Sequence, residues 1–69
     1  MDYLERQLSF LKKVINEGFL SPQSPLLQEQ KEIIIDTLYE LSICSGSEID
    51  KGKIGLEVDK RFADELGVE

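Results

Sequence analysis

The chain has 69 residues, of which 41% are hydrophobic and 32% charged, a balance typical of one small folded domain. One cysteine and no histidine exclude an internal disulfide, a zinc site of cysteines and histidines, and catalysis by a serine–histidine or cysteine–histidine pair. The formal net charge is −6, and a negative surface repels nucleic-acid phosphates and anionic lipids. We therefore expect a single domain over residues 1–69 that is not an enzyme and has no metal ion or cofactor.

The first residues lack the basic start and continuous apolar run of a secretion signal. No stretch reaches the roughly 18–20 consecutive apolar residues that a membrane-spanning helix needs. The lone Cys44 is consistent with a reducing compartment. We therefore expect a cytoplasmic protein with no membrane partner.

The first segment predicts a helix over residues 2–17. Asp2 is a good N-cap, and Glu5 three residues later completes a pair that resembles a capping box. Gly18 is a natural C-terminal cap. Two neighbouring apolar strips recur at helical spacing, one of Leu4, Leu8, Leu11 and Ile15 and one of Tyr3, Phe10 and Val14.

Residues 19–25 form the connection, and each of its two prolines follows a serine. A serine–proline pair can supply the N-cap and first residue of a helix, and we favour Ser24 and Pro25 for these positions. Phe19 and Leu20 are expected to fold back onto the core.

The second segment predicts a helix over residues 25–44. Its three consecutive isoleucines favour a strand locally, but the helical period persists for about twenty residues, much longer than a usual strand. Four apolar residues are expected to face the first helix: Leu27, Ile34, Leu38 and Leu41. The opposite strip is wholly acidic and consists of Glu29, Glu32, Asp36 and Glu40.

The apolar face of this second helix is wider than a chain of 69 residues can cover, since Leu26 and Ile33 extend it on one side. We therefore expect the second helix at the centre of the fold and a homodimeric helical bundle, with Ile35 and Tyr39 nearer the second copy. The residues predicted to self-associate are Tyr3, Phe10, Val14, Ile35 and Tyr39.

The third segment predicts a helix over residues 48–66, capped by Ser47. Its apolar face consists of Val58, Phe62 and Leu66, extended by Ile49, Leu56 and Ala63. Gly52 and Gly55 disfavour a helix but would admit a close neighbour. In the alternative, residues 48–55 form a loop or short strand and the helix begins near Leu56. The predicted fold is thus all-α, a helical hairpin plus a third helix.

No motif indicates a chemical site. When Gly52 takes the sixth position of an EF-hand loop, Ile49, Lys51 and Val58 fall on ligand positions and offer no side-chain oxygen. Gly52 and Gly55 otherwise form only an isolated G-x-x-G, without the surrounding pattern of a phosphate-binding loop. These absences favour a non-enzymatic protein-interaction module, a small acidic regulator or assembly factor that acts through helix–helix contacts.

Three interpretations of the acidic strip stay open. It can bind a basic protein, pair with Arg6, Lys12 and Lys13 of another copy, or be only the solvated face of the helix. An alternative function is nucleic-acid association through the third helix. The bases available for it are Lys51, Lys53, Lys60 and Arg61, but residues 48–69 also carry seven acids, which makes nucleic acid the less favoured partner.

Overall fold

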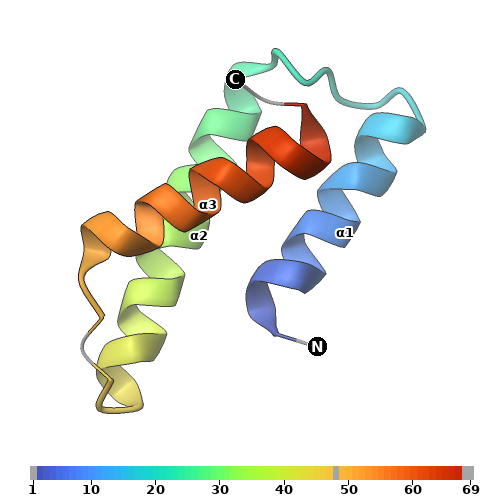
Figure 1. Cartoon of the computed structure of the whole chain (residues 1–69). Helices are drawn as coiled ribbons and strands as arrows, with labels where there is room; N and C mark the ends of the chain where they lie inside the picture. The colour runs from blue at the N-terminus through green and yellow to red at the C-terminus, as the bar shows by residue number, and fades with distance from the viewer. Residues whose placement is uncertain (1, 48, 68–69) are drawn as a thin grey trace.

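The computed structural model describes residues 2–47 and 49–67 of the chain. This part consists of three α-helices and contains no strand: α1 (Tyr3–Asn16), α2 (Pro25–Cys44) and α3 (Lys51–Leu66) (Figure 1). The all-α prediction is therefore confirmed.

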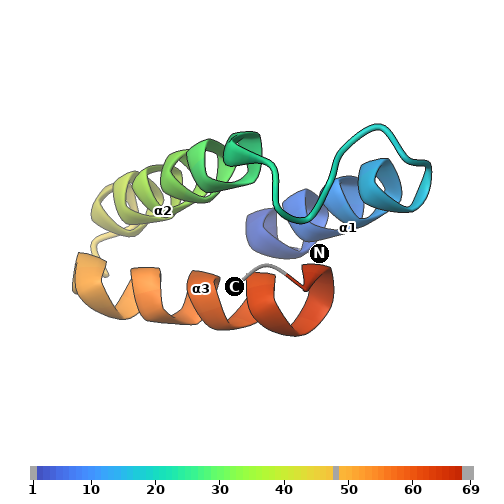
Figure 2. The ribbon, with the colours of Figure 1, turned by 90° about the horizontal axis from the view of Figure 1, so that it is seen from above.

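The two hairpin helices α1 and α2 lie in one layer, and α3 lies across both of them in a second layer (Figure 2). The contact between α2 and α3 is the most extensive and that between α1 and α2 the least. The prediction that the second helix lies at the centre is therefore wrong, because α3 holds the other two together. A single face of α3 supplies this contact along its whole length, through Ile54, Val58, Phe62 and Leu66.

The core brings together apolar side chains from all three helices. Its buried residues are Leu4, Leu8, Leu11, Leu27, Ile34, Ile54, Val58, Phe62 and Leu66. Ile15, Leu20 and Leu38 are among the side chains that pack against it from partly buried positions. Complete burial of a side chain the size of leucine or phenylalanine contributes about 1.5–3 kcal/mol, so this cluster is the main source of stability.

The first two helices begin at the predicted caps. An Asp2 side-chain oxygen accepts a hydrogen bond from the Glu5 amide at 2.8 Å, and the Ser24 hydroxyl accepts one from the Leu26 amide at 3.2 Å. α1 ends where Gly18 adopts a φ of +82°, a conformation that glycine reaches without steric penalty. The Phe19 amide then bonds the Val14 carbonyl at 3.1 Å, which closes the helix end.

The third helix begins later than predicted. Its N-cap is Asp50, whose carboxylate accepts a hydrogen bond from the Gly52 amide at 3.1 Å. Ser47 is therefore not the cap, and Glu48 lies outside the described residues. The alternative start near Leu56 is also wrong. The Asp50 carboxylate, two residues before Gly52, caps the first turn of α3, and the helix includes both Gly52 and Gly55.

Several apolar residues predicted to be in the core are exposed instead. Phe19 extends from the connection into solvent, and Leu41 is half exposed. Leu41 lies beyond the reach of α1, because α1 has 14 residues against 20 in α2. On α3, Leu56 and Ala63 lie away from the buried face, and Ile49 lies ahead of the helix.

Candidate interaction surface

An exposed apolar strip runs along α2. It consists of Leu26, Ile33 and Leu41, whose exposed fractions are 56%, 52% and 50%. These residues are seven and eight positions apart, so they lie along one side of the helix. We call this set the outer strip of α2. Sequence reasoning assigned Leu41 to the core and treated Leu26 and Ile33 only as a widening of the apolar face.

The outer strip is turned away from α3. The α3 side of α2 is marked by the Lys31 ammonium, which lies 2.9 Å from the Asp59 carboxylate. It is also marked by Ile35, since a Cβ atom at Gly55 would lie 3.9 Å from its Cδ1. At about 100° per residue, Ile33 lies roughly opposite the midpoint of Lys31 and Ile35. The outer strip therefore lies on the side of the α1–α2 layer that α3 leaves uncovered.

The four acidic residues of the predicted partner site follow the outer strip along its edge. Glu29, Glu32, Asp36 and Glu40 are all exposed. The Asp36 carboxylate accepts a bond from the Lys51 ammonium at 2.6 Å, which raises the pKa of Lys51. The other three make none of the ion pairs found within residues 2–47 and 49–67. The helix thus presents an apolar strip bordered by negative charge.

On α1, the predicted self-association residues form a second outward surface. Phe10 is 62% exposed and Val14 is partly buried, whereas Tyr3 is partly buried and also packs against the core of its own chain. Arg6 and Lys13 are exposed beside them, on the side of α1 opposite its buried leucines. We call Tyr3, Phe10 and Val14 the outer strip of α1.

This second strip also lies away from α3. The Arg61 guanidinium of α3 donates a hydrogen bond to the Glu65 carboxylate, which raises the pKa of Arg61, and the charge of Glu5 on α1 raises this pKa further. Glu5 therefore marks the α3 side of α1. Phe10, five residues later, lies about 140° around the helix from Glu5. The outer strips of α1 and α2 accordingly belong to the same face of the α1–α2 layer. Figure 2 shows α3 on the other side of this layer.

Ile35 and Tyr39 do not belong to this face. Both were expected nearer a second copy, but both pack against the core of their own chain. The Lys51 ammonium of α3 lies 5.7 Å from the centre of the Tyr39 ring, within the range of a cation–π contact. α3 therefore covers the side of α2 that carries these two residues.

The four bases of α3 are not free to act together on a phosphate backbone. Lys51 is paired with Asp36, and Arg61 with Glu65 at 2.6 Å. Lys53 and Lys60 are exposed, but Glu57 and Asp59 share the same short stretch of helix. Each acid near a phosphate would offset one base.

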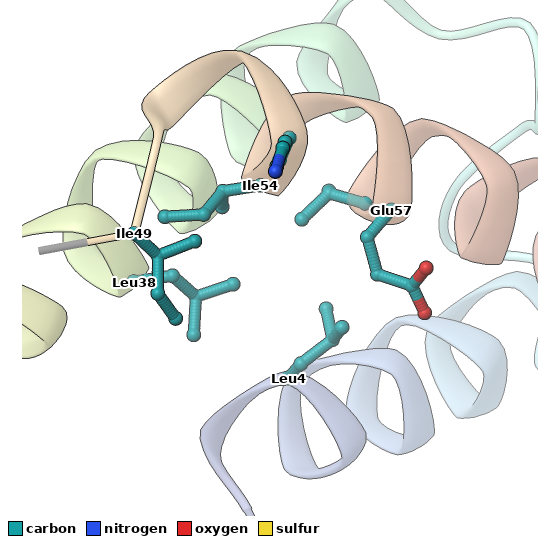
Figure 3. Close-up of a pocket in the computed structure, with 7 residues that line it drawn as sticks. Leu4, Leu38, Ile49, Ile54 and Glu57 are labelled. Atoms are coloured by element: carbon teal, nitrogen blue, oxygen red, sulfur yellow. The ribbon is translucent and has the colours of Figure 1, made fainter. Parts of the chain in front are cut away.

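A small apolar groove lies between the first turn of α1, the α2–α3 connection and the first half of α3 (Figure 3). Its volume is about 280 Å³. The groove is lined by Leu4, Leu38, Ile49, Ile54 and Val58, with Lys53 and Glu57 also contributing. The sequence did not predict it, because it depends on the angle between helices and on the position of Ile49 in the α2–α3 connection.

Elsewhere in the described part of the chain, reactive and metal-binding side chains do not converge on one point. Cys44 is exposed. No group of three histidine, cysteine, aspartate or glutamate side chains that could hold a metal ion occurs among residues 2–47 and 49–67. None of the helices in these residues is both long and apolar enough to span a membrane.

Comparisons with protein-family models, with curated proteins and with solved structures find no match to this chain.

Proposed function

We propose that this protein is a non-enzymatic interaction module, a small acidic regulator or assembly factor that binds another protein through the face of α1 and α2 opposite α3. The observation that carries this proposal is the outer strip of α2. Single exposed leucines are common on protein surfaces, but three large aliphatic side chains in line along one helix form an extended apolar surface. Covering such a surface contributes about 25 cal/mol per Å² of apolar area removed from water.

The charges beside the strip indicate which partners fit. Glu29, Glu32 and Glu40 are exposed at its edge, so they favour a partner that carries lysine or arginine next to its own apolar contact residues. A basic helix meets both requirements. Because Cys44 is a single thiol with no partner cysteine in the chain, we include a cytoplasmic location in the proposal.

The test compares the wild-type chain with an Ile33→Glu variant as immobilised bait in a lysate of the source cells. Leu56→Glu is the matched control, because Leu56 is the most exposed leucine of α3 and is outside the proposed face. Mass spectrometry should identify a protein, either further copies of this chain or another polypeptide, that wild type and the Leu56→Glu control retain and Ile33→Glu loses. Equal retention by all three baits, or none, would contradict the proposal.

The nucleic-acid alternative has less support, because Lys51 and Arg61 are engaged in ion pairs within the chain. A gel-shift titration on an arbitrary DNA duplex at low salt separates the two functions. The interaction-module proposal expects no shift at micromolar protein. A salt-sensitive shift that Lys53→Glu and Lys60→Glu abolish would instead favour nucleic-acid association.

A further inference from the structure

We infer that the partner on this face is a second copy of the same chain, with α1 of each copy packed against the outer strip of α2 of the other. This inference rests on the proposed function, because it names the occupant of the same surface. Three properties of the two outer strips support it: the match of their charges, the position of those charges, and the spacing of the apolar residues.

The charges of the two strips are opposite. Arg6 and Lys13 border the outer strip of α1, and neither is among the ion pairs of residues 2–47 and 49–67. Glu29 and Glu40 border the outer strip of α2 and are equally unpaired within those residues. A contact between the two strips therefore places unpaired bases next to unpaired acids, which favours this pairing over contacts between like helices.

The charges also lie on the edges that such a contact brings together. In each helix the order around the surface is core, outer strip and then charged edge, so the charged edge of α1 points away from α2 and that of α2 away from α1. A twofold axis that runs along the helices between two copies places α1 of one copy over α2 of the other. The basic edge of one helix then meets the acidic edge of its partner at the rim of the interface.

The spacing of the apolar side chains fits this arrangement. α1 and α2 are antiparallel in the hairpin, so α1 of one copy is antiparallel to α2 of the other (Figure 1). Tyr3 and Phe10 are seven residues apart, and Leu41 and Ile33 are eight. At about 1.5 Å per residue these separations differ by only about 1.5 Å. Phe10 then lies opposite Ile33, and Tyr3 lies toward the Leu41 end of the outer strip of α2.

The available area is sufficient. A stable protein–protein interface buries roughly 800 Å² on each partner. The accessible surface of the chain is 4822 Å², so the interface needs about a sixth of it. The uncovered side of a layer of two helices, in a molecule whose longest extents are 39 and 22 Å, is large enough for this.

The first experiment is light scattering from micromolar to millimolar protein. The wild-type chain should approach twice the monomer mass of 7.9 kDa. Ile33→Glu should raise the dimer dissociation constant by about a hundredfold or more, since each dimer buries two such carboxylates. Leu56→Glu should leave the constant unchanged. Circular dichroism of each variant verifies that it is folded.

The second experiment tests which helices meet. Lys13→Glu and Glu29→Lys should each weaken the homodimer about tenfold, because each homodimer then contains two pairs of like charges. In a mixture of the two variants the heterodimer contains only opposite pairs, so native mass spectrometry should show it in large excess over both homodimers. A statistical mixture would overturn the pairing of α1 with α2.

A wild-type mass of 7.9 kDa at every concentration would overturn the inference as a whole. The bait experiment then distinguishes self-association from the broader proposed function of binding another protein. Retention of a different protein through the outer strip leaves the proposed function standing without self-association. Absence of any retained protein contradicts both.

Discussion

The helices α2 and α3 differ in how fully one chain can cover their apolar residues. The apolar face of α3 is narrow, and its four core residues Ile54, Val58, Phe62 and Leu66 are buried within the monomer. The apolar residues of α2 surround more than half of the helix, and only Leu27 and Ile34 among them are fully covered. A narrow stripe is satisfied by two neighbouring helices, whereas a wide face leaves a strip exposed when only two neighbours exist. We therefore assign the exposed apolar side chains of α2 to the proposed interface and the buried apolar side chains of α3 to folding.

The sharpest way to break this comparison is to place a charge on each side of α2 in turn. Ile34 is fully buried, and an aspartate there introduces an unpaired charge whose burial costs several kcal/mol, comparable with the stability of so small a domain. The Ile34→Asp variant should therefore lack the circular dichroism signal of a helix, whereas the Ile33→Asp variant, changed at the neighbouring position, should remain folded. A folded Ile34→Asp variant would show that the orientation of α2 is wrong.

Truncation on α3 should give the next largest effect. Phe62 is fully buried, so Phe62→Ala should lower the free energy of unfolding by about 3–5 kcal/mol or prevent folding at ambient temperature. Leu56 is 71% exposed, so Leu56→Ala should change it by less than about 0.5 kcal/mol. Urea denaturation measures both, and similar losses at the two positions would mean that α3 does not hold the core through a single face.

The start of α3 supplies a smaller, separate effect. Asp50→Ala removes the side-chain oxygen that bonds the Gly52 amide and should cost about 1 kcal/mol. Ser47→Ala should be close to neutral, because Ser47 lies outside the first turn of the helix. Thermal unfolding followed by circular dichroism compares the two, and a larger loss from Ser47→Ala would restore the earlier helix start predicted from the sequence.

The smallest effect concerns the ion pair that joins α2 to α3. The Asp36 carboxylate raises the pKa of Lys51 above its ordinary value of 10.5. The stabilisation from this pair is therefore complete below pH 10.5 and is lost as the pH rises through the folded-state pKa. NMR titration of the Lys51 side chain should show the raised pKa in wild type and a lower one in Asp36→Asn. Because Lys51 is exposed, the effect on stability should be slight.

The secondary structure was largely predictable because its signals are local. The Ser24–Pro25 start of α2 and the acidic strip follow from residue types and the helical period alone. The start of α3 was missed by three residues, since Ser47 and Asp50 are both good caps and the sequence does not rank them.

The arrangement of the helices was not predictable in the same way. Periodicity identifies the apolar side of α2 but not which neighbour covers each part of it, so Ile35 and Tyr39 were assigned to a second copy and Leu41 to α1. Both assignments were wrong because the sequence shows neither the central position of α3 nor how the shorter α1 lies beside α2. The outer strip of α2 became recognisable as a surface only once those two features were known.

An isotope-filtered NOE experiment on a mixture of ¹³C-labelled and unlabelled chains tests most directly whether the face opposite α3 is an interface. At concentrations where the dimer is populated, the methyl groups of Ile33 in the labelled copy should show NOEs to the ring of Phe10 in the unlabelled copy, and Leu56 should show none. The absence of any intermolecular NOE from Ile33 at millimolar protein, or NOEs from Leu56 in its place, would contradict the proposed interface.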